Sequence, residues 1–225
     1  MTTMTTPMTE EDIKDDVEEQ LYWDDRVNAS DVGVTVDDGI VALRGTVPTH
    51  FARNAAVSDA MSIAGVTDVT DNLTVSYPSS TTTPTSTELV ADVEAVLRIN
   101  PDIDASDIDV EVTGGQVTLD GAVDAFWKKL RAEALASNVS GAVSIDNQLN
   151  VIRAKDFIDQ DIGEAITEAL ERNALVEAQD VDVIVEDGVV TLAGTVPTRT
   201  ARQAAYNAAR YTLGVVDVHN NLLVE

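Results

Sequence analysis

An acidic segment with the sequence PDIDASDID holds side chains at a spacing that could bind calcium. Asp102, Asp104 and Ser106 would supply the first, third and fifth ligands of an EF-hand loop. Such a loop also needs glycine at its sixth position and glutamate at its twelfth, where this chain has Asp107 and Thr113. We therefore expect a turn or a helix cap in this segment and no metal site.

Three glycine-containing lines, DDGIVALRGTVPT, TGGQVTLDGAVDA and EDGVVTLAGTVPT, could be mistaken for loops that bind phosphate. None of them has the G-x-x-x-x-G-K-[ST] pattern, whose lysine and hydroxyl bind phosphate and magnesium. In each line, two glycines six residues apart enclose an alternating hydrophobic segment, which is typical of a strand and does not begin a helix. We interpret these lines as scaffold, in which glycine permits tight turns.

The residue types that most often perform catalysis are scarce in this chain. It has no cysteine, and its two histidines, His50 and His219, fall at unrelated positions of the sequence. No serine lies in a G-x-S-x-G elbow, the usual signature of an α/β-hydrolase nucleophile. A zinc site or a histidine-based catalytic site needs several such ligands or partners. We therefore predict that the protein is not an enzyme and uses no cofactor or metal.

The three glycine lines belong to one longer repeat. The first glycine of each line is followed by a second after six residues and by a third after a further 20 residues. Identical spacing in three copies indicates three tandem structural units, and we predict that these glycines occupy turns. They are Gly39, Gly45 and Gly65 in the first copy, Gly115, Gly121 and Gly141 in the second, and Gly188, Gly194 and Gly214 in the third.

Each copy combines helical and strand periodicities in the same order. Apolar residues at every fourth position, such as Ile13, Val17 and Leu21, predict a first helix. Alternating segments on both sides of a D-G or G-G turn predict a hairpin. An Ala-rich second helix follows, with Pro48 and Pro197 at its first position, and then a last strand. The predicted fold is α/β, an α+β sandwich of three α-β-β-α-β units, each a small three-stranded sheet covered by two helices.

The segments outside the copies differ in composition. The first linker reads SYPSSTTTPTST and has no core-forming pattern, which predicts a mobile spacer. Only a few residues separate the second and third copies. The predicted organisation is a disordered tail at 1–9, a first unit at 10–76, a Ser/Thr/Pro linker at 77–86, a second unit at 87–152 and a third unit at 153–225.

The repeated pattern V-x-V-x-(D/G)-G-x-V-x-L-x-G-x-V, then a helix, then G-V-x-x-V-x-N-x-L-x-V, resembles the BON domain, named for bacterial osmotic-shock and nodulation proteins. The match recurs around the glycines of the second and third copies and covers nearly the whole chain. In the first copy it consists of Val34, Val36, Gly39, Val41, Leu43, Gly45, Val47, Gly65, Val66, Val69, Asn72, Leu73 and Val75.

The resemblance implies a non-enzymatic binding module. Members of this family are associated with osmotic stress, phospholipid surfaces, outer-membrane maintenance, secretin pores and, in one cytoplasmic branch, potassium binding. This sequence differs from the periplasmic members because it lacks a signal peptide. It differs from the potassium-binding branch because it lacks the peptidoglycan-binding module usually attached there. The family has no shared ligand motif that could be carried over to named residues.

Acidic residues dominate the composition. Forty Asp and Glu residues face 14 Lys and Arg residues, which gives a formal net charge of -26. Such a chain repels nucleic acid and bare anionic membranes and attracts cations diffusely. The acidic, lysine-poor composition is halophile-like and indicates a salt-adapted prokaryote. The sequence shows neither a secretory signal nor a run of 18 apolar residues, so we expect a soluble cytoplasmic protein.

Charge is distributed unevenly among the predicted helices. The first helix of the first unit, residues 10–26, carries nine acidic residues against Lys14 and Arg26. The second helices of the second and third units carry basic residues instead. An acidic helix of one unit could dock against a basic helix of another, within or between chains. The predicted interaction surface consists of Lys128, Lys129, Arg131, Arg199, Arg202 and Arg210.

The two tryptophans fall in predicted helices. Trp23 lies beside Tyr22, and Trp127 lies beside Phe126. Two interpretations stay open for them. They pack in a core or between repeats, as large aromatic side chains usually do, or they are exposed anchors at a partner interface.

Together these features predict a triple-BON binding or scaffold protein, associated with osmotic or envelope stress. It would act through protein–protein contacts and by self-association, which can close a ring or extend as a filament. One alternative is a cation binder of the potassium type, or a binder of another small ligand, supported by the net charge. A second alternative is a binder of phospholipid surfaces, which the strongly negative charge disfavours.

Overall fold

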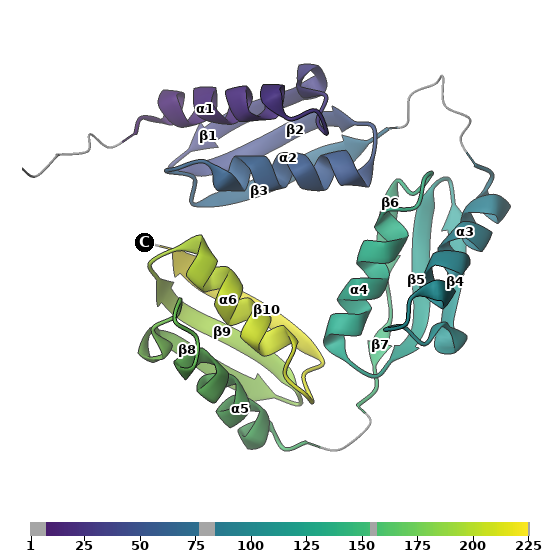
Figure 1. Cartoon of the computed structure of the whole chain (residues 1–225), viewed down its shortest axis with the longest axis vertical. Coiled ribbons are helices and arrows are strands. Elements are labelled where there is room, and N and C mark those ends of the chain that lie inside the picture. The colour runs from purple at the N-terminus through teal and green to yellow at the C-terminus, as the bar shows by residue number, and fades with distance from the viewer. Residues whose placement is uncertain (1–7, 77–83, 154–156, 225) are drawn as a thin grey trace, which may run out of the picture. The chain divides into compact units, whose positions relative to one another are not determined.

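The computed structural model describes residues 8–76, 84–153 and 157–224. Within them the chain forms three copies of one arrangement, helix–strand–strand–helix–strand, with a short 3-10 turn before the first strand of each copy. Figure 1 shows the copies, coloured from purple through teal to yellow. The predicted fold class is confirmed. Most of the predicted tail and linker, residues 1–7 and 77–83, lies outside the described residues.

The first copy begins with a helix that its own sequence caps. The Thr9 hydroxyl accepts a hydrogen bond from the Asp12 backbone N–H at 3.2 Å, and the Asp12 carboxylate accepts one from the Thr9 N–H at 2.9 Å. Ile13, Val17 and Leu21 form the buried stripe of this helix. The elements of this copy are α1 (Glu10–Trp23), η1 (Ala29–Asp31), β1 (Val32–Asp37), β2 (Ile40–Val47), α2 (His50–Ser62) and β3 (Asp68–Val75).

The sheet of the first copy has β2 at its centre. β1 pairs with β2 antiparallel through the tight turn at Asp38 and Gly39, while β3 pairs with β2 parallel. In this register Val41 lies opposite Val36 on one side and Val69 on the other. α1 packs over β1 and α2 packs over β3, so both helices cover the same face and enclose a core of Val, Leu, Ile and Ala.

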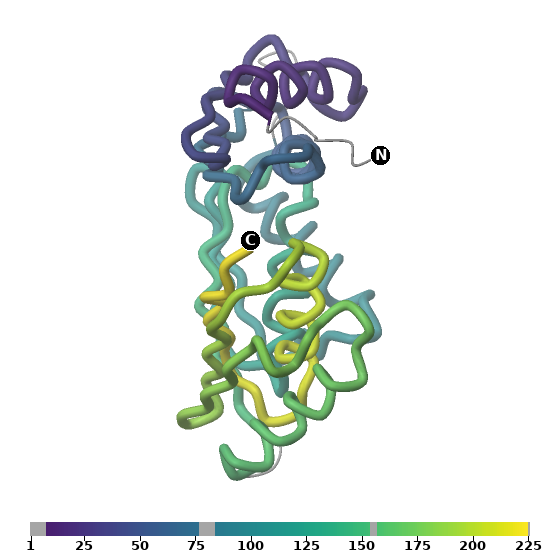
Figure 2. Tube along the Cα trace, turned by 90° about the vertical axis from the view of Figure 1, so that its left-hand side faces the viewer, coloured from purple at the N-terminus to yellow at the C-terminus, as the bar shows by residue number. Residues whose placement is uncertain are grey.

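The third copy repeats this topology, with strand order β10-β9-β8. β8 pairs with β9 antiparallel and β10 pairs with β9 parallel. Ile162, Ile166 and Leu170 form the buried stripe of its first helix. The path of this copy can be followed from green to yellow in Figure 2. Its elements are α5 (Asp159–Glu171), η3 (Ala178–Asp180), β8 (Val181–Glu186), β9 (Val189–Val196), α6 (Arg199–Arg210) and β10 (Asp217–Val224).

The second copy differs in its last strand. Where one strand was expected, the structure has two short ones, with Gln148 and Leu149 between them. The Gln148 N–H still donates to the Leu119 carbonyl at 2.8 Å, so the line of pairing along β5 continues through the interruption. The elements are α3 (Ser86–Ile99), η2 (Ala105–Asp107), β4 (Ile108–Thr113), β5 (Gln116–Val123), α4 (Phe126–Ser137), β6 (Ser144–Asn147) and β7 (Asn150–Val151).

The second glycine of each copy is required by a close backbone approach. Gly45 has φ +125°, and a Cβ built there would lie 1.9 Å from the carbonyl oxygen of Asp31. No side chain fits such a position, because the obstacle is backbone and cannot rotate away. The same approach joins Gly121 to Asp107 at 2.0 Å and Gly194 to Asp180 at 2.1 Å. The middle strand therefore crosses directly beside the 3-10 turn in all three copies.

The first and third glycines lie at another shared junction. Gly39 has φ +77° in the hairpin turn, and its Cβ would lie 2.8 Å from the Gly65 carbonyl oxygen. The Gly39 carbonyl accepts a hydrogen bond from the Thr67 N–H at 2.7 Å. Equivalent bonds run from Val143 N–H to the Gly115 carbonyl and from Val216 N–H to the Gly188 carbonyl. The hairpin turn is thus fastened to the turn that begins the last strand.

The prolines of the second helices lie two positions before the first helical residue, which is the position predicted for them. α2 and α6 begin at His50 and Arg199, after the capping threonines Thr49 and Thr198. The Thr49 hydroxyl accepts a hydrogen bond from the Ala52 N–H at 3.1 Å, and Thr198 caps α6 in the same way. Pro48 and Pro197 therefore precede the cap, because threonine is the residue that can satisfy the free backbone N–H groups.

Candidate interaction surfaces

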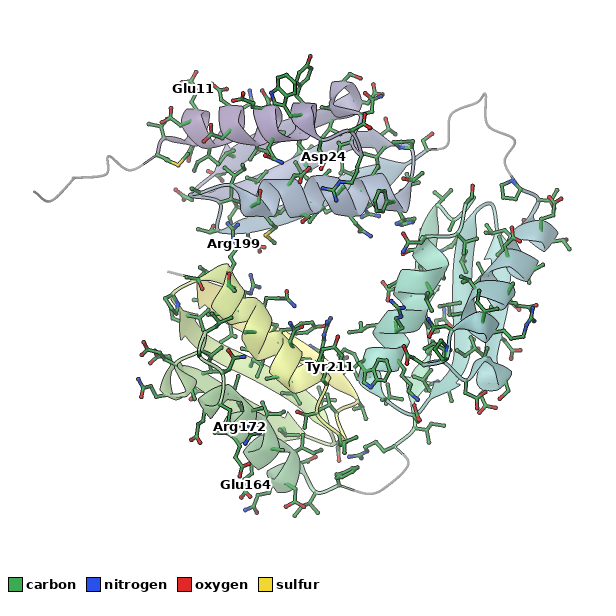
Figure 3. All side chains as sticks on the ribbon, viewed as in Figure 1. Glu11, Asp24, Glu164, Arg172, Arg199 and Tyr211 are labelled. Atoms are coloured by element: carbon green, nitrogen blue, oxygen red, sulfur yellow. The ribbon has the colours of Figure 1, made fainter. Side chains whose placement is uncertain are left out.

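A stripe of basic and aromatic residues runs along α6. Arg199, Arg202, Tyr206 and Arg210 follow one another at intervals of three and four residues, so they lie along one side of the helix. The helix has no acidic residue, and its alanines at positions 201, 205 and 209 are buried. Figure 3 labels Arg199 at one end of α6 and Tyr211 just beyond the other. Three of the six predicted surface residues are thus brought into one row.

Arg210 is half-buried beside two aromatic neighbours. Its guanidinium carbon lies 4.6 Å from the ring centre of Tyr211 and 5.6 Å from that of Tyr206. Its Nη2 also donates to the Tyr211 hydroxyl at 2.8 Å. Burial raises the pKa of the Tyr206 phenol above its ordinary value. The contacts fix the direction of one cation without neutralising it.

The basic residues of α4 are less available than the sequence indicates. Lys128 Nζ lies 2.8 Å from Asp124 Oδ1 and 5.7 Å from the ring centre of Trp127. Lys128 and Lys129 are half-buried, as are the three arginines of α6, whereas Arg131 is exposed. Glu133 on the same helix lowers the net positive charge further. The positive surface of α4 is therefore weaker than that of α6.

One basic position recurs in all three copies. Arg53, Lys129 and Arg202 each lie 14 residues after the first glycine of their copy. Arg53 Nε lies 2.7 Å from Asp71 Oδ2 on β3, which ties the second helix of that copy to its last strand. Asn147 replaces the aspartate in the second copy and donates to the Lys129 carbonyl at 3.0 Å. The recurrence was visible in the sequence, but its structural role was missed.

The opposite charge is concentrated on α1. Seven of its 14 residues are acidic against one lysine, Lys14, whose Nζ lies 3.4 Å from Glu18 Oε1. No basic residue lies in its last turn, where a cation would offset the negative end of the helix dipole. Figure 3 labels Glu11 near the start of this helix. The exposed carboxylates are those of Glu10, Glu11, Asp12, Asp15, Asp16, Glu18 and Glu19.

An exposed aromatic pair ends this acidic helix. Tyr22 is 72 % exposed and Trp23 is 74 % exposed, and their rings meet edge to face with centres 5.3 Å apart. The interpretation of these two residues as core is therefore wrong. Leu21 points inward at the same turn, so its two successors on the helix must face solvent. Phe126 is buried, and Trp127 is half-buried.

A charged cluster, which the sequence analysis did not single out, lies between α1 and α2. Asp59 on α2 is only 6 % exposed, and its Oδ1 lies 3.5 Å from Arg26 Nη2. Arg26 also binds the Asp24 carboxylate, through Nε at 2.9 Å and through Nη2. The positions equivalent to Asp59 are Leu135 and Ala208, so the buried carboxylate belongs to the first copy alone. Figure 3 labels Asp24 just beyond α1.

The neighbours of Asp59 determine its ionisation. Burial raises its pKa to about 6, and the hydrogen bond and negative charge of Asp24 act in the same direction. Arg26 and a hydrogen bond from Gln20 act against this shift. Asp24 itself is bonded to Arg26, which lowers the pKa of Asp24 well below its ordinary value. The two carboxylates therefore titrate in separate ranges although they share one arginine.

The acidic segment considered for calcium forms a turn. Asp104 Oδ1 accepts hydrogen bonds from the Ser106 backbone N–H at 3.1 Å and from its hydroxyl at 2.7 Å. These bonds lower the pKa of Asp104 and stabilise the start of η2. Within the described part of the chain, no group of three or more histidine, cysteine or acidic side chains could hold a metal ion. His50 lies at the start of α2, and His219 lies on β10.

The structure thus defines a class of tandem-repeat protein, built from small α+β domains whose helices carry contrasting charge. The chain belongs to the BON domain family, whose sequence profile matches residues 9–77, 85–153 and 158–225. It is 30% identical over 142 residues to osmotically-inducible protein Y of Escherichia coli (strain K12), covering 59% of this chain and 68% of that protein. No helix in the described residues is long and apolar enough to span a membrane.

Solved structures of CdsD, a structural protein of the type III secretion system of Chlamydia trachomatis, are also similar. The C-terminal domain is 16% identical, covering 97% of this chain and 100% of that one, with a TM-score of 0.27. A second CdsD structure is 17% identical, covering 95% of this chain and 92% of that one, with a TM-score of 0.26. Similarity at this level carries no information about function.

Proposed function

We propose that this chain is a non-enzymatic binding and scaffold protein of the osmotic stress response, which acts through protein–protein contacts and self-associates. The association with osmotic stress is supported by its similarity to osmotically-inducible protein Y. A binding role is supported by the helices of the three copies, which share one fold but carry different charged and aromatic residues.

The segregation of charge between α1 and α6 is the observation that carries the proposal. α1 holds seven carboxylates and one lysine, whereas α6 holds three arginines and no acid. Two such helices attract each other at short range, and in this proposal α1 of one chain docks against α6 of another. Because the two surfaces differ, each chain offers both ends of the contact, and assembly can continue to a ring or a filament.

The six basic residues make different contributions to this contact. Arg199 and Arg210 occupy positions that hold no arginine or lysine in the other copies, and Arg210 is pre-oriented by two tyrosine rings. Lys129 and Arg202 lie at the recurring position that, in the first copy, joins helix to strand. We assign the main contribution to Arg199 and Arg210, which are half-buried, and a secondary one to the exposed Arg131 of α4.

Two experiments test the two parts of this proposal. Light scattering of the purified chain at several concentrations should give a mass above that of the monomer that rises with concentration. A monomer at every concentration would exclude self-association. For the stress role, the amount of the protein in its native cells should rise after an osmotic upshift, whereas an unchanged amount would contradict it.

A further inference from the structure

A groove runs along the third copy between α5 and β8. It has a volume of about 500 Å³, and its floor is formed by Val183 and Val185 of the strand. One wall is the side of α5 that carries Gly163, Glu164 and Thr167, with Glu168 a turn further on. The groove is therefore apolar at its base and acidic along its rim.

Gly163 lies in the wall of the groove and contributes no side chain to it. Glycine in the middle of a helix costs about 1 kcal/mol relative to alanine, so its presence there is unfavourable for α5 itself. The equivalent positions in the other two copies hold Lys14 and Val90. Val34, the counterpart of Val183 in the first copy, is 4 % exposed, whereas Val183 and its second-copy counterpart Val110 are both half-buried. A Cβ on Gly163 would meet Val185 Cγ2 at 3.6 Å, so larger side chains would occupy the groove without disturbing the backbone.

The strand beside the groove is an edge strand. In the described part of the chain β8 pairs with β9 and lies at the end of the sheet order β10-β9-β8. Its outer side presents backbone N–H and C=O groups that can pair with another strand. When a peptide adds to a sheet edge next to a helix, these backbone hydrogen bonds provide affinity. Its alternate side chains, which enter the groove, provide specificity.

The charge around the groove indicates the kind of segment that it accepts. Glu164 and Glu168 lie on the wall, and Asp159 lies at its end, where its carboxylate also accepts the Asp187 and Gly188 N–H groups. Among the described residues, two cations lie near its ends: Arg172, just past the end of α5 (Figure 3), pairs with Glu168 at 3.3 Å, and the Arg153 guanidinium lies beside Gly188. We propose that this groove binds an extended, positively charged peptide segment of a partner protein, which adds to β8 as a further strand. Every second side chain of the segment would rest on Val183 and Val185, while its lysines or arginines face the carboxylates.

The partner is a different protein and not a second copy of this chain. With a net charge of -26, this chain supplies few basic residues, and those of α6 lie on a helix rather than on an extended segment. The proposal is therefore independent of the contact between α1 and α6, and it survives if self-association is absent.

The probe is a capped peptide of alternating lysine and valine. Two control peptides are compared with it: one of alternating glutamate and valine, and a lysine–valine peptide whose central valine is replaced by proline. Binding to the full chain is followed by calorimetry, and amide hydrogen exchange locates it. We expect the lysine–valine peptide alone to bind and to slow exchange in β8. Gly163→Val should weaken binding about tenfold or more, because the side chain fills the groove. Ala165→Val, on the same helix but outside the groove, should bind like the native chain.

Diffuse attraction to an acidic protein is the competing explanation, and the variants separate the two. Gly163→Val leaves every charge in place, so equal binding by this variant would overturn the proposal. The proposal would also be overturned if the proline peptide bound as tightly as the lysine–valine peptide. The same holds if the bound peptide slowed amide exchange elsewhere but not in β8. Gly163→Ala adds a single methyl group and strengthens the helix, so it should give an intermediate affinity. Because this variant is not destabilised, its loss of peptide affinity cannot come from unfolding.

Discussion

The carboxylate of Asp59, buried between α1 and α2, lies 3.5 Å from the guanidinium of Arg26, which also binds Asp24. This arginine faces two carboxylates, and Asp59 Oδ2 is buried with no hydrogen-bond partner among the residues that the structure describes. A proton on Asp59 removes the surplus negative charge, so proton binding and folding are linked at this site.

Stability of the first copy should therefore rise as the solution is acidified from neutral pH. Asp59 has a pKa of about 6 in the folded chain against an ordinary value of 3.8. Between about pH 7 and pH 4 the folded state binds a proton that the unfolded state does not, and the gain is on the order of 1 kcal/mol. Below that range Asp24, whose pKa is lowered, loses its contact with Arg26 and stability falls again. Hydrogen exchange of the α2 amides measures this profile.

Asp59→Asn should flatten the profile between pH 7 and pH 4 and raise stability at pH 8 by on the order of 1–2 kcal/mol, since the variant buries no charge. Acidification also weakens the general repulsion of a chain with net charge -26. The matched control is Asp25→Asn at an exposed neighbouring position, which removes the same charge. If both variants keep the native pH dependence, Asp59 is not the group that responds.

Gly45→Ala should unfold or strongly destabilise the first copy. The new methyl group would lie 1.9 Å from the Asp31 carbonyl oxygen, at a φ of +125°. We expect the free energy of unfolding to fall by on the order of 3 kcal/mol or more. Urea unfolding, monitored through the amide signals of the first copy, measures it. Gly33→Ala is the control, because its Cβ would lie 3.8 Å from the nearest atom, the Arg44 carbonyl oxygen. Similar losses at both sites would show that the close approach is not the cause.

Arg53 and Asp71 should be energetically coupled. Their side chains are 29% and 25% exposed, and the pair joins α2 to β3. A double-mutant cycle with Arg53→Met and Asp71→Asn should give a coupling of about 0.5–1 kcal/mol in the same unfolding assay. Strictly additive losses would mean that the recurring basic position does not hold the helix to the strand.

The fold was predictable because its determinants are local and occur three times. The alternating valines, the Asp38–Gly39 turn and the stripe of Ile13, Val17 and Leu21 specify strand, hairpin and helix without knowledge of distant residues. Repetition then distinguished positions required by the fold from those that vary. The predicted roles of the six basic residues, by contrast, depend on neighbours that sequence spacing does not reveal.

Features formed by segments far apart in the sequence were not predictable in the same way. The contact of Gly45 with Asp31, the burial of Asp59 and the groove beside Gly163 all depend on how separate elements meet. Exposure of Trp23 followed from the helix phase set by Leu21, which a stricter count of the buried stripe would have found. The recurrence of Arg53, Lys129 and Arg202 was also available from the repeat alone.

The central claim is that α1 and α6 form the contact between chains, and an exchange of charge between them tests it most directly. Light scattering at about 0.15 M salt, where charges interact over roughly 8 Å, should show assembly of the native chain. Arg199→Glu with Arg210→Glu should leave monomer. Adding Asp15→Arg and Glu19→Arg on α1 should restore the assembly, because the attraction is re-formed with its direction reversed. The account would be contradicted if the variant with both α6 substitutions had the same assembled mass as the native chain. A native chain that is monomeric would contradict it as well.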